Sequence, residues 1–166
     1  MLTNLLIMEP HYYQVDINWS SDRKGVMCSP ELNVMTPGSN GCIEVATPPQ
    51  FPKGIPGIWS PEHLFTAAVS SCLMTTFLAI AENSKLEFQS FNCHSKGKLE
   101  QVEGKFLMTE VILEPRVMIL HEKDRERAER VLQKSESACL ISNSIKSKVS
   151  MHPVIEVATA TPVNPD

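Results

Sequence analysis

The sequence predicts an α+β fold in which a small antiparallel meander precedes a long central helix, with a hairpin and a second helix behind it. Three observations carry this prediction. Residues 12–46 contain short alternating segments separated by glycine and proline. Residues 61–83 form an apolar run behind a strong helix start, and residues 86–116 contain two long segments typical of strands.

Composition predicts a soluble globular protein of 166 residues, forming one domain over residues 1–166 with about 12–157 ordered and 158–166 as a tail. We expect no membrane-spanning helix, because by this reading no apolar run reaches the ~20 residues that one needs. The beginning of the chain lacks a secretory signal, so a cytoplasmic protein is expected. A net charge of −4 without a basic cluster argues against a nucleic-acid partner.

The first expected element is an antiparallel meander built from the segments YQVDINW, GVMCS and ELNVM, with turn residues at Gly25, Pro30, Pro37 and Gly38. Residues 47–60, TPPQFPKGIPGIWS, come next. Their prolines exclude a helix or a central strand, so a semi-rigid surface loop is predicted. A loop of this length inside a compact domain is more often functional than not.

A long helix is predicted to begin at Pro61. Ser60 can cap the free N–H groups, proline is tolerated at the first helical position, and Glu62 complements the positive end of the helix dipole. The apolar residues that follow surround almost the whole cylinder, which predicts a central, buried helix. Cys72 lies in the middle of this run, SPEHLFTAAVSSCLMTTFLAIA.

The second half of the chain is predicted to open with a long hairpin, FQSFNCHSKGKL and KFLMTEVILEP, which turns near Glu103-Gly104 and is closed by Pro115. A second helix follows, because small and apolar residues recur at three- and four-residue steps beside the mixed charges of HEKDRERAER. Cys139 is expected at its inner end. A short piece capped by Ser142 and a last strand, VSMHPVIEVA, complete the predicted order.

The five cysteines are an odd number without any C-x₂-C pair: Cys28, Cys42, Cys72, Cys93 and Cys139. In a chain expected to be intracellular, this argues against a disulfide scaffold, so that any disulfide would be a transient step of chemistry or the cysteines are small core residues. The spacings of a zinc site are missing, and adjacent strand residues such as Cys93-His94 should point to opposite faces. We expect no metal and no bound cofactor.

Cys72 needs a source of activation if it is reactive. Apolar surroundings raise the pKa of a thiol, and the dipole acts only at the ends of a helix. The run from residue 61 to residue 83 contains no Lys or Arg, so a cation must come from elsewhere in the chain. The best sequence candidate is Arg23, in DRKG. Without such a cation, Cys72 is simply a packed core residue.

The segment WSPEHLFTAAVSSCLMTTFL, together with a later cysteine in SESACLISNSIKSKV, resembles the OsmC/Ohr family of thiol-dependent hydroperoxide reductases. The resemblance covers about residues 14–157 in element order. It rests on P-E-x-L ten residues before Cys72, on the A-x-S-S-C surroundings, and on Cys139. It implies an OsmC-like fold, with antiparallel sheets wrapped around two central helices in an intertwined homodimer.

The resemblance also implies roles for individual residues. Cys72 would attack the peroxide and Cys139 would resolve the product, while Arg23 and Glu62 would hold Cys72 as thiolate. An external dithiol reductant of the lipoyl or thioredoxin type would restore the thiols. The apolar residues expected to line the pocket and to favour organic hydroperoxides are Phe65, Leu73 and Phe77. Many members have proline after the second cysteine, where this chain has Leu140.

Helix geometry adds an expectation about assembly. Glu62 and Cys72 are ten residues apart on one predicted helix, which separates them by roughly 15 Å. They can share a site only if Glu62 of one copy faces Cys72 of another across a two-fold axis, so an obligate homodimer is expected. Two other function classes stay open: an OsmC-fold ligand-binding or stress protein without peroxidase turnover, and a thioesterase of the hot-dog type.

Overall fold

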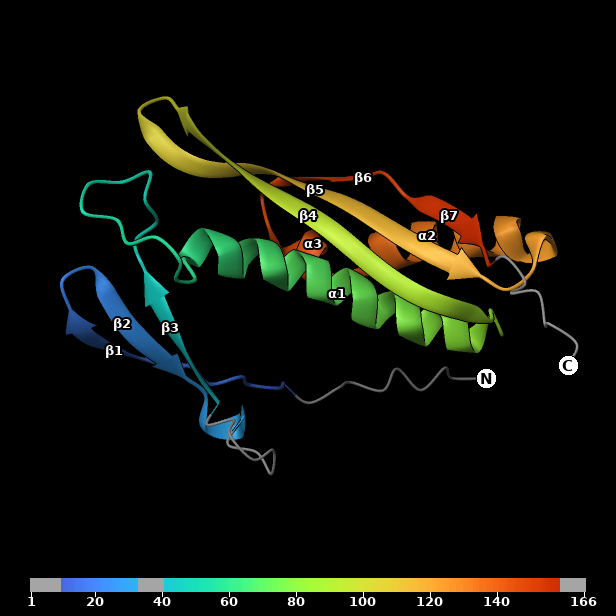
Figure 1. Cartoon of the computed structure of the whole chain (residues 1–166), viewed down its shortest axis with the longest axis horizontal. Helices are drawn as coiled ribbons and strands as arrows, with labels where there is room; N and C mark the ends of the chain where they lie inside the picture. Colours follow the sequence, from blue (N-terminus) through green and yellow to red (C-terminus); the bar gives the residue numbers. More distant parts are fainter. Residues whose placement is uncertain (1–9, 33–40, 159–166) are drawn as a thin grey trace, which may run out of the picture. The chain divides into compact units, whose positions relative to one another are not determined.

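The computed structural model describes residues 10–32 and 41–158 of the chain (Figure 1). It divides into two compact units, Met1–Pro61 and Glu62–Asp166, which are described separately below. The expectation of one domain over residues 1–166 stays a prediction. The tail expected at the C-terminus lies, from residue 159 on, outside the described residues.

The first unit contains the predicted three-stranded antiparallel meander. Its strands, in the spatial order β1-β2-β3, are β1 (Asp16–Ser21), β2 (Lys24–Cys28) and β3 (Cys42–Ala46). The predicted position of the third strand, ELNVM, is wrong in the part that is described, because Pro30–Leu32 forms a short 3-10 helix (η1). Proline has a fixed φ and no N–H for a ladder, and the next described strand, β3, begins after Gly41, whose φ is +65°.

The meander has one apolar and one polar face, because directly paired residues point to the same side and the sides alternate along each strand. The register places five residues on the apolar face: Ile17, Trp19, Met27, Ile43 and Val45. The polar face carries Asp16, Asn18, Lys24 and Glu44, together with Val26 and Ala46, of which Ala46 is buried. Trp19 is 77% exposed, so the apolar face of the meander is largely open within the described residues. Residues 47–60 contain only turns and one bridge, as predicted for a loop.

Cys28 and Cys42 are joined by a disulfide between β2 and β3. The sequence argued against a disulfide scaffold, and this pairing was not expected. The register of the strands is the physical reason, since Cys28 and Cys42 are directly opposite each other in the ladder. Sequence spacing alone does not reveal such a register, because residues 29–41 lie between the two cysteines.

The second unit begins with the predicted central helix, α1 (Pro61–Asn83). By length and composition alone α1 could cross a membrane, which corrects the expectation that no apolar run is long enough. Its sheet-facing side is nevertheless built into a protein core. The buried residues of α1 are Val69, Cys72, Leu73, Phe77 and Ala81.

A four-stranded sheet packs against α1. Its long antiparallel hairpin, β4 (Phe88–Val102) and β5 (Lys105–Ile119), turns at Glu103 and Gly104, whose φ values of 49° and 80° suit a two-residue hairpin turn. The predicted hairpin is therefore confirmed. The predicted last strand is divided into β6 (Lys148–Met151) and β7 (Val154–Val157), both parallel to β5, because Pro153 cannot donate to a ladder.

The prediction that Pro115 closes the second strand of the hairpin is wrong, since β5 continues to Ile119. Pro115 pairs with Cys93 of β4 on one side. On the other side, pairing with β6 ends at Leu113 and pairing with β7 begins at Arg116. Pro115 thus lies in the gap between two short strands, where its missing N–H costs no ladder bond.

The remaining helices cover the same face of the sheet as α1 (Figure 1). A short turn of 3-10 helix, η2 (Glu122–Asp124), leads into α2 (Arg125–Ala138), and α3 (Leu140–Ser144) follows after one residue. Residues of α1, β5 and α2 form one continuous core, in which the buried members are Phe77, Ala81, Leu86, Val117, Ile119, Ala128, Val131 and Leu132. The core fixes α1 and the α2–α3 junction relative to one another.

Candidate active site

Cys72 and Cys139 lie together, although 66 residues separate them in the sequence. Cys72 is buried in the middle of α1, and Cys139 is buried at the junction of α2 and α3. Cys139 has extended backbone dihedrals, φ −65° and ψ 109°, which end α2 and allow α3 to begin in a new direction. The two thiols are free and in hydrogen-bond contact.

The surroundings of Cys72 favour its thiolate. Burial acts against the charged form and would raise the pKa of the Cys72 thiol. Hydrogen bonds outweigh burial: the Cys139 thiol donates to Cys72, and so do the backbone N–H of Ile141, the Thr76 hydroxyl and the backbone N–H of Leu140. The net effect is that the pKa of Cys72 is lowered from its ordinary value.

The surroundings of Cys139 have the opposite effect. Burial raises the pKa of the Cys139 thiol, and its role as donor to Cys72 raises this pKa further. The hydroxyl and the backbone N–H of Ser142 lower it, but they do not reverse the direction. Cys72 is therefore the residue that loses its proton first, and Cys139 is the thiol that keeps its proton beside it.

Sequence reasoning missed the donors on the α2–α3 junction. It named Arg23 as the source of activation, whereas the second unit supplies the backbone N–H groups of Leu140 and Ile141 as well as Thr76. Backbone N–H groups cannot be recognised from residue type, because almost every residue has one. One feature of the sequence could nevertheless have indicated a donor next to Cys139. Leu140 stands where proline follows the second cysteine in many relatives of this kind, and only a residue other than proline has an N–H to donate.

Glu62 lies in the first turn of α1, ten residues before Cys72 on the same continuous helix. Its Oε2 atom is buried and has no hydrogen-bond partner in the part of the chain that the structure describes. A buried carboxylate oxygen without a partner is costly and calls for a cation. Arg23 belongs to the first unit, in the turn between β1 and β2, so its role beside Cys72 stays a prediction.

The three residues expected to line the pocket lie on the side of α1 that packs against the sheet. Leu73 and Phe77 are fully buried, and Phe77 contacts the rings of Phe88 and Phe91 at centroid distances of 5.2 and 4.8 Å. Phe65 is partly buried against the same layer. In the second unit these three side chains belong to the hydrophobic core or pack against it. Their role in lining a substrate pocket stays a prediction.

A groove of about 490 Å³ lies instead between α1 and α2. It is lined by Ile80, Gln133, Lys134, Ser137 and Ala138. Ala138 is the residue before Cys139, and Ile80 is two turns beyond Cys72 on α1, so the groove leads away from the pair of thiols.

A family model described as OsmC-like protein matches residues 54–153, which include both thiols. The chain belongs to the OsmC-like family. The uncharacterized protein YmaD of Bacillus subtilis is 24% identical to this OsmC-like protein over 147 residues, 87% of this chain and 93% of the relative.

Solved structures share the fold of this OsmC-like protein. An OsmC-like protein of unknown function from Vibrio cholerae has a TM-score of 0.75 at 21% identity, and covers 87% of this chain and 100% of its own. An organic hydroperoxide resistance protein from Legionella pneumophila has a TM-score of 0.68 at 20% identity, with 90% and 100% covered. The organic hydroperoxide resistance protein OhrB of Bacillus subtilis has a TM-score of 0.61 at 18% identity, with 89% and 98% covered.

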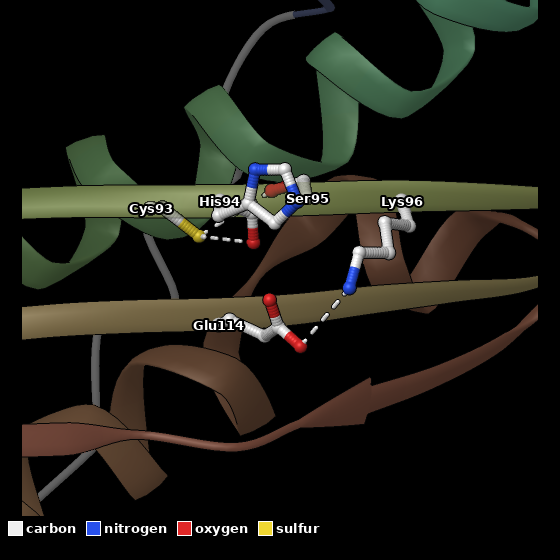
Figure 2. Close-up of polar contacts among 5 residues, drawn as sticks. All are labelled: Cys93, His94, Ser95, Lys96 and Glu114. Atoms are coloured by element: carbon white, nitrogen blue, oxygen red, sulfur yellow. Dashed lines mark hydrogen bonds and ion pairs between the residues drawn. The ribbon is translucent and has the colours of Figure 1, made fainter.

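Cys93, the third free thiol of this OsmC-like protein, lies on the inner side of β4, where it packs against Val69 and Leu73 of α1 and their neighbours. Its Sγ is 3.4 Å from the Ser95 hydroxyl, which donates to Ser70 of α1 at 2.9 Å. Figure 2 shows the neighbouring outer side chain Lys96 reaching Glu114 of β5.

Over residues 10–32 and 41–158, the structure contains no group of three or more His, Cys, Asp or Glu that could hold a metal ion.

The Leu140 N–H can be tested by the change Leu140→Pro. Leu140 is the first residue of α3, a position that tolerates proline, and Cys139 has the extended backbone that a following proline requires. Loss of one hydrogen bond to the thiolate should lower the alkylation rate of Cys72 at pH 7 about tenfold.

The measurement is the pH dependence of Cys72 alkylation by iodoacetamide, which follows the thiolate fraction. Its midpoint should move to higher pH in Leu140→Pro. The control is Leu140→Ala, because the side chain is 66% exposed and this change keeps the N–H. Equal pH profiles for the two variants would show that the N–H does not act on Cys72.

Proposed function

We propose that this OsmC-like protein is a thiol-dependent peroxidase that reduces organic hydroperoxides, with Cys72 as the attacking and Cys139 as the resolving residue. One observation supports this most directly. A buried cysteine with a lowered pKa accepts a hydrogen bond from a second buried cysteine with a raised pKa. Groups outside the pair also donate to the Cys72 sulfur, namely the N–H groups of Ile141 and Leu140 and the Thr76 hydroxyl, as a peroxidase that holds one thiolate requires.

In the proposed reaction the Cys72 thiolate attacks the terminal oxygen of the hydroperoxide. The O–O bond breaks, the alkoxide leaves and takes up a proton as the alcohol, and Cys72 becomes a sulfenic acid. Cys139 then attacks the sulfenic sulfur, and water leaves with the thiol proton. The resulting Cys72–Cys139 disulfide is reduced by an external dithiol of the lipoyl or thioredoxin type, so that no bound cofactor is required.

The preference for organic hydroperoxides is supported by the groove between α1 and α2, which is lined by Ala138, the residue before Cys139. Ile80 and Ala138 give it an apolar wall against which an alkyl chain can lie. Several solved structures of the same fold are named organic hydroperoxide resistance proteins, at identities of 18–20%. We propose a cytoplasmic protein of oxidative stress defence, without nucleic-acid or membrane partners.

A homodimer is part of the proposal. Glu62 and Cys72 are roughly 15 Å apart along α1, so Glu62 of one copy can serve Cys72 only in the other copy. Two apolar surfaces are available for burial: the apolar face of the meander, and an open side of α1 that carries Met74 and Leu78. In such a dimer, Arg23 would pair with Glu62 and add its charge to the thiolate.

The dimer predicts the effect of a charge on the open side of α1. Leu78→Asp should convert the dimer into monomers, because Leu78 is 43% exposed in the single chain and would be desolvated between two helices. Light scattering during gel filtration measures the mass. Leu107→Asp is the matched control, since Leu107 is 46% exposed near the tip of the β4–β5 hairpin. Equal masses for both variants would contradict the proposed interface.

The peroxidase is tested by turnover of an alkyl hydroperoxide with a dithiol donor, in an assay coupled to NADPH oxidation. The wild type should turn over repeatedly. Cys139→Ser should consume about one equivalent of peroxide and stop as a sulfenic acid, which a dimedone adduct on Cys72 detects by mass. A wild type that never consumes peroxide would favour the stress protein without turnover. Hydrolysis of acyl thioesters that survives alkylation would favour a thioesterase.

A further inference from the structure

The Cys28–Cys42 disulfide lies on the polar face of the meander. Cys28 is directly opposite Cys42 of β3 on one side and Asp16 of β1 on the other, so all three side chains point the same way. Both cysteines are partly exposed. In the first unit as described, a dissolved thiol can therefore reach this disulfide.

The strands do not depend on the disulfide for their register. Five consecutive residue pairs join β2 and β3, and Cys28↔Cys42 is the last of them. Beyond it, the Ser29 N–H donates to the Gly41 carbonyl at 3.1 Å, so backbone pairing continues past the cysteines. After reduction the two thiols would therefore remain opposite each other, and they could close again without a search through unfolded conformations.

We propose that Cys28–Cys42 is a second thiol–disulfide exchange site, separate from Cys72 and Cys139, that takes an external dithiol reductant. A donor thiolate attacks one sulfur and forms a mixed disulfide, and the other cysteine leaves as thiolate. The second donor thiol then releases the first cysteine. Two electrons pass from the dithiol to the protein, which ends with two thiols, while the donor ends as a disulfide.

Asp16 gives this exchange a preferred direction. Asp16 is directly opposite Cys28 in the ladder, so its negative charge disfavours a thiolate on Cys28. Release of Cys42 as thiolate is therefore favoured over release of Cys28. The same carboxylate slows the approach of an anionic donor. The inference does not rest on the peroxidase proposal, because it involves none of the residues of that site.

The experiment uses the wild-type protein in its folded state. It is treated first with dithiothreitol and then with oxidised dithiothreitol, and thiols are trapped with iodoacetamide and located by peptide mass spectrometry. Cys28 and Cys42 should gain label together on reduction and lose it together on oxidation, with unchanged circular dichroism. Labelling only after unfolding, or equal labelling before and after oxidation, would overturn the proposal. Cys93, free throughout, is the internal control.

A pair of charge variants tests the part assigned to Asp16. Asp16→Asn should raise the rate of reduction at Cys28–Cys42 about threefold at low salt, because the reacting sulfurs carry negative charge. Asp22→Asn is the matched control: it makes the same change in the turn between β1 and β2, at a φ of 45° that asparagine tolerates. Equal rates for the two variants would contradict the role of Asp16.

Discussion

Replacing Cys72 with serine is expected to lower the rate of hydroperoxide turnover by at least about a thousandfold, because a hydroxyl does not ionise near neutral pH and is a poor nucleophile toward peroxide. The hydrogen bonds from Cys139, Leu140 and Ile141 favour a thiolate at this position, and an uncharged serine makes no use of them. The measurement is turnover of an alkyl hydroperoxide with a dithiol donor, followed from pH 5 to pH 9.

The control for Cys72→Ser is Cys93→Ser, which removes another free thiol of the same unit, outside the pair. It should retain the rate of the wild type. The wild-type rate should rise with pH through the lowered pKa of Cys72 and level off below the pH at which an ordinary cysteine ionises. Peroxide consumption by Cys72→Ser at the parent's rate would refute the mechanism.

Replacing Phe77 with alanine is expected to lower the free energy of unfolding by about 3–5 kcal/mol. Phe77 is completely buried in the core between α1, β5 and α2, and its ring packs against Phe88 and Phe91. The loss combines the transfer free energy of the ring with the cavity that remains. Such a change is a large part of the 5–15 kcal/mol by which a typical protein is stable.

Urea denaturation followed by circular dichroism measures this loss. The matched control is Phe106→Ala, since Phe106 is 59% exposed near the β4–β5 turn. The free energy of unfolding of this variant should differ from that of the wild type by less than about 1 kcal/mol. If Phe77→Ala does not fold, Phe77→Leu provides a milder cavity with the same direction of effect. Equal midpoints for the Phe77 and Phe106 variants would mean that the core is assigned wrongly.

The long elements were predictable because their signals are local. Ser60, Pro61 and Glu62 mark the start of α1, and the pair Glu103-Gly104 marks the turn of the hairpin. The short elements were less predictable from the sequence. The third strand of the meander, the division of the last strand and the continuation of β5 past Pro115 depend on which strands lie side by side, and this information is not local.

The candidate site also contains some residues that the sequence could predict and some groups that it could not. Cys72 and Cys139 could be proposed from their residue type and motif, and the structure places them in contact. The Leu140 and Ile141 N–H groups could not, because every residue except proline has one and only the fold decides where it points. The Cys28–Cys42 pair was missed for a related reason, since strand register decides whether two distant cysteines meet.

Cys139 and two of the groups that stabilise the Cys72 thiolate belong to one stretch of three consecutive residues, at the bend between α2 and α3. In the proposed reaction, activation of the first sulfur and capture of its oxidised form would both depend on this bend. A substitution that displaces the bend should therefore change both half-reactions at once.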